Sequence, residues 1–343
     1  MFSKSLKRLF PSESPIAFSS AETADQRGRV SITDLDSVAT KETFNEADYL
    51  AANTDVARDV ERGIWKTGRA HFDRYGHSEA RSLRRSSLIH AARAQKLEKI
   101  LPLLNMEMPH VRRGDKFDFL SDELRAETGI SDTDNVASNN YDGYIETLIE
   151  SVPDGLILDC GAGKRKKYYS NVLNYEIVDY DTTDVVGVGE ALPFKDGSFD
   201  GVISVAVLEH VRDPFRCASE IIRVLKPGGK LICCVPFLQP LHGYPHHYYN
   251  MSPQGIRALF DRSLVIDDHK VIESLLPIWS LQWIVNSWAA GLSGATREAF
   301  LNTPLKDLMR QPNDMLHESW VKELPEEKNF ELASATMVFA HKP

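Results

Sequence analysis

The chain of 343 residues has little of three features that mark specialised classes of protein. Only four cysteines occur, without a Cys-x-x-Cys pair, which argues against a disulfide scaffold or a zinc ribbon. The formal net charge of -9 argues against a nucleic-acid partner, because phosphate contacts need an excess of Lys and Arg. The N-terminus lacks the apolar stretch of a secretory signal. We therefore expect a cytoplasmic globular protein with buried, reduced thiols.

The sequence also lacks a third glycine in the loop after the first predicted strand. Asp159, Gly161 and Gly163 follow an apolar run, and the next apolar run ends in Asp179, twenty residues after Asp159. Strands ending in paired glycines and then in an acid are typical of an adenosine site in an open α/β sheet. A dinucleotide site needs a third glycine, and that position is Lys166. S-adenosylmethionine carries no phosphate, so the pattern favours it over NAD.

A set of ordered motifs follows the glycines. Residues 189–194 read GEALPF, and SFD, LEHV and EIIRVLKPGG come after them. In these motifs the chain resembles the class I S-adenosylmethionine-dependent methyltransferases, densely over roughly residues 137–260. The resemblance implies S-adenosylmethionine as cofactor, and it says far less about the methyl acceptor.

Strands and helices alternate through this region, which predicts a Rossmann-like, doubly wound, mostly parallel seven-stranded sheet preceded by a small α-helical module. The expected strands are 156–160, 175–179, 184–188, 199–206 and 230–236. The resemblance also implies a closing hairpin at one sheet edge, which strands near 263–273 and 334–341 would supply. Too few residues separate the second and third strands for a crossover helix.

The resemblance also implies roles for the cofactor-binding residues. The two glycines admit the methionine half of the cofactor, Asp159 holds its amino group, and Asp179 binds the ribose diol. Glu190 lies near the adenine. Glu209 and His210 follow the fourth strand, where ligand clefts open. The expected cofactor site is therefore Asp159, Gly161, Gly163, Asp179, Glu190 and Glu209.

Residues 236–250, PFLQPLHGYPHHYYN, are dense in groups that exchange protons near neutral pH. We predict acceptor binding and general-base catalysis there, with His246 or His242 as the base and His210 as a further candidate. Two alternatives are a metal site on His242 and His246, which stand four residues apart, and aromatic packing of a lid. No metal site is expected, because a paired carboxylate is lacking nearby.

Two other segments bear on the acceptor. The basic run 164–167 is expected near the start of a helix, as a solvated face or as a site for a phosphate-bearing acceptor. Residues 274–296 carry no charge, but Pro277 and two amides interrupt the run, so a spanning helix is not expected. We predict a lid over the acceptor pocket, or alternatively a peripheral contact with the inner membrane.

Four regions are expected along the chain. They are a flexible leader (1–43), a small helical module (44–86), linking helices (87–130) and a methyltransferase domain (131–343). The module resembles one found in bacterial proteins concerned with surface glycans. Its matching positions are Tyr49, Leu50, Asn53, Asp55, Val56, Gly63, His71, Phe72, Gly76, Glu79 and Arg81.

Because the resembling module occurs in proteins concerned with surface glycans, we expect the methyl acceptor to be an oxygen on a sugar, a glycolipid or another envelope-related molecule. Two alternatives remain open. One is a methyltransferase for a small metabolite or a quinone-like ring. The other is a non-catalytic adaptor on a methyltransferase scaffold. The oligomeric state is left undetermined.

Overall fold

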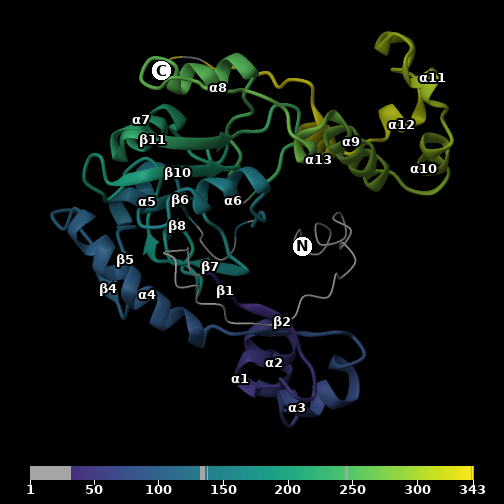
Figure 1. Ribbon diagram of the computed structural model, residues 1–343. Coiled ribbons are helices and arrows are strands. Elements are labelled where there is room, and N and C mark those ends of the chain that lie inside the picture. Colours follow the sequence, from purple (N-terminus) through teal and green to yellow (C-terminus); the bar gives the residue numbers. More distant parts are fainter. Residues whose placement is uncertain (1–31, 132–135, 137, 244–245, 341, 343) are drawn as a thin grey trace.

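The computed structural model describes residues 32–131, 136, 138–243, 246–340 and 342. A seven-stranded sheet forms its centre, in the order β11-β10-β6-β8-β9-β5-β4 (Figure 1). Every neighbouring pair in this sheet is parallel except β4 with β5. The mostly parallel α/β fold is therefore confirmed. The strands are β4 Val111–Arg113, β5 Lys116–Asp118, β6 Ile157–Cys160, β8 Val172–Glu176, β9 Val185–Val186, β10 Phe199–Val205 and β11 Leu225–Cys234.

The antiparallel hairpin is formed by other segments than those predicted. Residues 263–273 and 334–340 form no strand, and the apolar side chains there are largely exposed, such as Val265 at 87%. Residue 341 lies outside the described residues. The hairpin is instead β4–β5, which turns through Gly114 at a φ of 63° and pairs with β9. These segments were assigned to the hairpin that the resemblance to methyltransferases implies, but a strand also needs a partner and a face to bury.

Helices cover both faces of the sheet. α6 (Gly143–Glu150) packs Ile145, Leu148 and Ile149 on one face. α4 (Ser87–Ile100), α7 (Pro214–Val224) and α8 (Pro253–Phe260) contribute to the core on the other face. Alternation along β6 places Ile157 in the first core and Leu158 in the second.

The connection from β6 to β8 contains no α-helix. It holds a short strand, β7 (Lys167–Tyr169), which pairs with β1 (Ile32–Asp34) near the N-terminus. The expectation that the basic run 164–167 begins a helix is therefore wrong. Only eleven residues separate the two strands, which is at the lower limit for a crossover helix.

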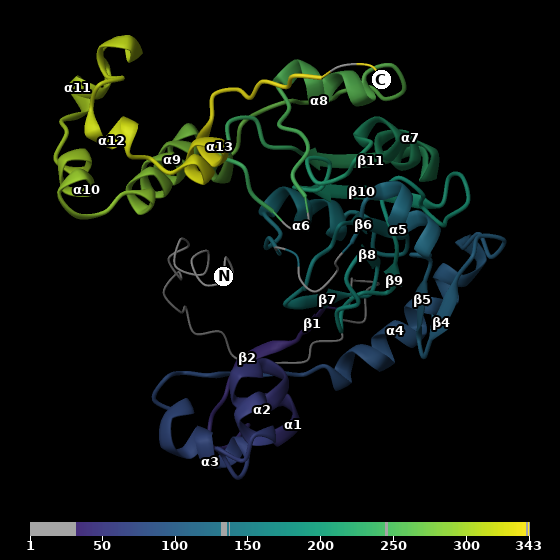
Figure 2. The same cartoon turned by 180° about the vertical axis from the view of Figure 1, so that it is seen from behind.

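The described end of the predicted leader is also structured. β1 and β2 (Asp36–Val38) lie within it, and β2 pairs with β3 (Ser82–Arg84), so the boundary at residue 43 is wrong. Residues 1–31 lie outside the described residues. The helical module follows, away from the sheet in both views (Figure 2), with α1 Glu46–Ala52, α2 Thr54–Glu61, α3 Gly68–His71 and a π-helical turn Phe72–Gly76.

The remaining α-helices are α5 (Asp122–Thr128), between β5 and α6 in the chain, and a C-terminal group that follows α8. The group comprises α9 Pro277–Gly291, α10 Gly294–Leu301, α11 Leu305–Leu308, α12 Ser319–Lys322 and α13 Glu326–Leu332. α9, α10 and α12 share a small core with Phe300 and Trp320. Among the described residues, none of the helices combines the length and apolar character needed to cross a bilayer.

Candidate functional site

The site is expected at the carboxyl ends of β6, β8 and β10. β6 stands at the point where the strand order reverses, with β8 on one side and β10 on the other. Loops on either side of such a point diverge and leave room for a ligand. Most of the predicted site residues follow these strands.

The glycine loop begins directly after β6. Gly161 has a φ of 85° and Gly163 a φ of 62°, which side-chain-bearing residues rarely adopt. A Cβ on Gly161 would lie 2.3 Å from a methyl carbon of Val207, in the loop after β10. Gly161 is thus required by the packing of two loops, in addition to any ligand that approaches the backbone.

The second strand ends in a different acid from the one expected. β8 ends at Glu176, and the predicted strand 175–179 therefore has wrong bounds. Glu176 is 5% exposed, and its carboxylate accepts hydrogen bonds from the backbone N–H of Gly163 at 2.7 Å and of Ile177 at 2.7 Å. Burial raises the pKa of Glu176, while these backbone donors act in the opposite direction.

Asp179 lies three residues further along, in the loop before β9. Its side chain is 41% exposed and forms an ion pair of 2.5 Å with Lys116 of β5. The structure thus places Glu176, and not Asp179, at the strand end beside the glycine loop.

Asp159 is buried beneath the loop and already has partners. Its carboxylate accepts hydrogen bonds from the Arg165 guanidinium, with Nε at 3.0 Å, and from the hydroxyl of Tyr141. The guanidinium also lies over the Tyr141 ring, 4.1 Å from its centroid. Arg165 is 9% exposed, whereas Lys164 and Lys166 on either side are exposed. The basic run is therefore no continuous cationic surface.

Glu190 lies in the segment after β9, and its side chain is 4% exposed. Its carboxylate accepts hydrogen bonds from the backbone N–H of Arg212 at 3.0 Å and of Asp213 at 3.5 Å. Burial raises the pKa of Glu190. It lines an open cavity of about 400 Å³, which is also bordered by Glu127, Thr128, Arg212, Asp213, Pro214, Phe215, Arg216 and Tyr249.

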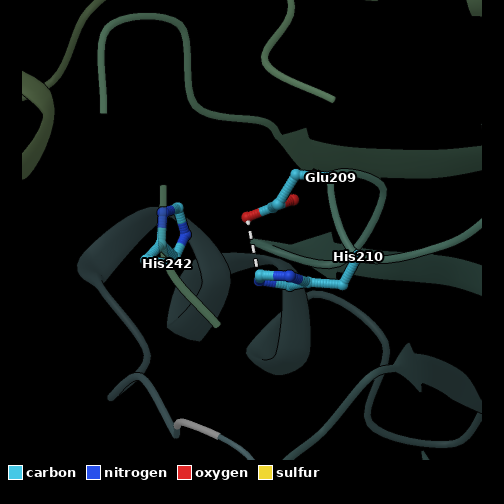
Figure 3. Close-up of side chains that lie close together, drawn as sticks. All are labelled: Glu209, His210 and His242. Carbon is cyan, nitrogen blue, oxygen red and sulfur yellow. Dashed lines mark ion pairs between the residues drawn. The ribbon is translucent and has the colours of Figure 1, made fainter. Parts of the chain in front are cut away.

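Glu209 and His210 follow β10 and face a second loop. Glu209 is fully buried, and neither carboxylate oxygen has a hydrogen-bond partner among the described residues. This desolvation raises the pKa of Glu209 to about 8. The side chain points toward His210, with 3.7 Å between Oε1 and Nε2, and His242 faces both from the other loop (Figure 3).

The histidine-rich loop brings its members to different places. His242 joins Glu209 and His210, and burial lowers its pKa to about 4. His246 instead bonds through Nε2 to the carbonyl of Gly129 at 2.8 Å. No described contact joins His242 to His246, so the metal pair considered from their spacing does not form. Tyr244, in the same loop, lies outside the described residues.

The loop is held against β10 by its own backbone. The N–H groups of Tyr248 and Tyr249 donate to the carbonyl of Glu209, at 2.7 and 3.2 Å. Gly243 has a φ of 95°, and a Cβ there would lie 2.3 Å from the His210 ring. The glycine therefore lets the loop approach His210 closely.

Sequence reasoning missed Glu176, Arg165 and Tyr141. Glu176 stands three residues closer to the glycines than Asp179, the acid that was expected at the strand end, and its place directly after the apolar stretch NVLNY was the available signal. Nothing in the local pattern distinguishes Arg165 from the lysines beside it. Its burial depends on Asp159, six residues away.

Comparison with known proteins identifies the central segment. Residues 160–233 match the family model described as "Methyltransferase domain". The chain is 29% identical over 126 residues to a demethylmenaquinone methyltransferase of Clavibacter sepedonicus, covering 34% of this chain and 46% of that protein. It is 30% identical over 112 residues to norajmaline N-methyltransferase of Rauvolfia serpentina, covering 33% and 32%. The chain thus spans half or less of the length of these relatives.

Solved structures with local similarity include a Thermotoga maritima protein described as a SAM-dependent methyltransferase, possibly acting on histamine. It is 22% identical, with 35% of this chain and 69% of that chain covered and a TM-score of 0.26. A putative methyltransferase of Bacillus halodurans is 16% identical, with 48% and 86% covered and a TM-score of 0.29. On the family match, residues 160–233 form a methyltransferase domain, and the cofactor of such a domain is S-adenosylmethionine.

Proposed function

We propose that the whole chain is an enzyme that transfers a methyl group from S-adenosylmethionine to an acceptor. One observation carries the proposal: the two left-handed glycines after β6 lie beside Glu176, a buried acid at the end of the adjacent strand. Such an arrangement offers a neutral backbone surface and a carboxylate, which suits an adenosine without phosphates. The match of residues 160–233 supports it.

The cofactor contacts follow from this arrangement. Gly161 and Gly163 line the methionine half, and Glu176 binds the ribose diol in place of Asp179. Glu190 is near the adenine, beside the cavity that it lines. Asp159 acts mainly through Arg165, because its carboxylate is occupied by that guanidinium and by Tyr141. The Arg165 guanidinium then becomes a candidate partner for the cofactor's carboxylate.

The acceptor is proposed to be an oxygen on a sugar, glycolipid or other envelope-related molecule. The N-terminal module supports this through its resemblance to a module of surface-glycan-associated proteins. The C-terminal helix α9 supports an acceptor with an apolar part. It contains no charged residue and exposes Ile278 by 60%, Trp279 by 44% and Leu281 by 52%. Its Trp283 contacts the His242 ring, with 5.2 Å between centroids.

A quinone-like ring is the second candidate acceptor. Its support is the similarity to demethylmenaquinone methyltransferases, which reaches 32% identity over 132 residues for the one from Renibacterium salmoninarum. In either case the transfer is an in-line displacement at the sulfonium methyl, with a neutral leaving group. His242 or His246 is the proposed base that takes the proton of the acceptor.

The test is incubation with methyl-labelled cofactor and separate acceptor fractions. We expect label in a polysaccharide or glycolipid fraction of the bacterial envelope, and loss of that label with Glu176→Gln. Label in a quinone fraction alone would select the second acceptor. Absence of label in every fraction, together with absence of cofactor binding in calorimetry, would leave the adaptor alternative and refute the enzyme.

A peripheral membrane contact through α9 is proposed for delivery of such an acceptor. The exposed apolar side chains of this helix fit the interfacial region of a bilayer. Ile278→Glu combined with Leu281→Glu should abolish co-sedimentation with anionic liposomes. If the unmodified chain does not sediment with the liposomes, the contact does not exist.

A further inference from the structure

The cluster of Glu209, His210 and His242 has a property that the transfer reaction does not require. Each residue offers one donor atom, and these three atoms lie within 4.8 Å of one another. Two donors bound tetrahedrally to one zinc ion, at bonds of about 2.0 Å, lie about 3.3 Å apart. Glu209 and His210 are already near this spacing, at 3.7 Å. A small rotation of the side chains completes it.

The hydrogen bonds of both histidines leave the facing nitrogen free to coordinate. His210 Nδ1 lies 2.7 Å from the carbonyl oxygen of His246, and His242 Nδ1 lies 2.8 Å from that of Pro240. A carbonyl oxygen only accepts, so each Nδ1 carries the proton and each Nε2 a lone pair. Metal-binding histidines in proteins are oriented by the same kind of backbone hydrogen bond.

Glu209 supplies the second, independent observation. A fully buried carboxylate is costly unless it is paired or binds a metal. Within the described part of the chain both of its oxygens lack a hydrogen-bond donor, and one of them faces the two imidazoles (Figure 3). The carboxylate is therefore placed where a cation would offset its burial.

We propose that Glu209, His210 and His242 bind one divalent transition-metal ion of the zinc class. Two imidazoles and one carboxylate favour zinc, iron(II) or cobalt(II) over magnesium, which prefers oxygen ligands alone. Three protein ligands leave at least one coordination position open. This step rests on the proposed function: the open position lies beyond β10, where the acceptor is proposed to bind, and it would suit an acceptor oxygen. A metal-bound His242 has no free basic nitrogen, so His246 is then the proposed base.

The test uses the full chain without an affinity tag, stripped with a chelator and titrated with Co²⁺. We expect one Co²⁺ per chain, seen as visible d–d absorption, and its displacement by Zn²⁺. Glu209→Gln and His242→Ala should each weaken binding by more than the roughly 10- to 100-fold that loss of an outer-shell partner costs. His269→Ala, an exposed histidine outside every helix and strand, is the matched control and should bind normally.

Two further measurements keep the outcomes separate. Thermal unfolding shows whether each variant is folded, and Zn²⁺ should raise the melting temperature of the unmodified chain but not of Glu209→Gln. S-adenosylmethionine is titrated into the stripped protein without metal. Cofactor binding without stoichiometric Co²⁺ binding overturns the metal site alone, as does equal Co²⁺ binding by all variants. Co²⁺ binding without cofactor binding would refute the proposed function and leave the metal site standing.

Discussion

At the scale of single residues, the account turns on which acid binds the ribose. Glu176 is buried at the end of β8 and holds the Gly163 N–H, whereas Asp179 lies at the surface with Lys116. A carboxylate accepts two hydroxyl hydrogen bonds, and these are stronger than those of a neutral amide. Substitutions at Glu176 and at Asp179 should therefore affect the affinity for S-adenosylmethionine differently.

We expect Glu176→Gln to weaken S-adenosylmethionine binding by about 10- to 100-fold, since hydrogen bonds to a charged group contribute about 1.5–3 kcal/mol. Asp179→Asn should leave the dissociation constant unchanged, because its side chain is 41% exposed and paired to Lys116. Calorimetric titration of both variants measures this. If the pattern is reversed, the ribose acid is Asp179, as expected from the sequence.

The limits of sequence reasoning are also visible at this scale. The glycine pair and Glu190 could be predicted as site residues because their types and spacing carry the signal. Arg165 was placed among exposed lysines, because only tertiary structure brings its guanidinium onto Asp159. Glu209 was expected to contact the cofactor, yet its carboxylate faces two histidines, one of them 33 residues away in the chain.

At the scale of elements, α4 is fixed to the sheet by a buried polar network. Asp184, before β9, accepts hydrogen bonds from Arg93 at 3.0 Å, from Lys96 at 2.8 Å and from the hydroxyl of Tyr168. Lys96 and Asp184 are both fully buried. Burial lowers the pKa of Lys96 to about 8, although the Asp184 carboxylate acts in the opposite direction.

This network predicts a dependence of stability on pH. The folded pKa of Lys96, about 8, lies below the unfolded value of about 10.4. Between these values the unfolded chain binds more protons, so the free energy of unfolding rises with pH. From pH 7.5 to 9.5 the contribution of Lys96 should increase by about 1–2 kcal/mol.

Lys96→Met keeps a side chain of similar length and removes the titrating group. Urea unfolding of both chains at the two pH values gives the difference. The unmodified chain should gain stability relative to Lys96→Met as the pH rises. A gap between the two chains that stays constant or moves in the other direction would show that Lys96 keeps an ordinary pKa.

Strands in the core could be predicted from the sequence more accurately than the segments at the edge of the sheet, and the reason is physical. β6 and β10 are mainly apolar and lie in the two cores, and the second half of β11, residues 231–233, packs against them, so the apolar pattern identifies these strands. The closing hairpin was assigned to residues 263–273 and 334–341 because the resemblance implies one, and a helix was expected after β6 because strands and helices alternate. Neither assignment considered which surface these segments would bury.

At the scale of the whole molecule, the helical module has its own core. Tyr49, Phe72 and Leu83 are buried in it, and the Tyr49 hydroxyl lies 2.9 Å from His71 Nδ1. Gly76 approaches this hydroxyl so closely that a Cβ would lie 2.0 Å away. Arg84 of β3 forms an ion pair with Asp36 of the neighbouring β2 and a second one with Asp181, which lies between β8 and β9 and so connects the module to the loops of the central sheet.

Gly76→Ala should therefore destabilise the module by about 1–3 kcal/mol through overpacking. Hydrogen exchange should speed up within residues 46–84, while cofactor binding stays unchanged. Adding Tyr49→Phe removes the clashing oxygen and should restore part of the protection. A loss of cofactor affinity in Gly76→Ala would contradict the independence of module and site.

The most direct measurement is calorimetric titration of the full chain with S-adenosylmethionine and, separately, with NAD. The site described here has two glycines and a buried carboxylate but no third glycine to bring a helix beneath a pyrophosphate. The account predicts one molecule of S-adenosylmethionine bound per chain and no heat from NAD. Binding of NAD, or no heat from S-adenosylmethionine, would contradict it.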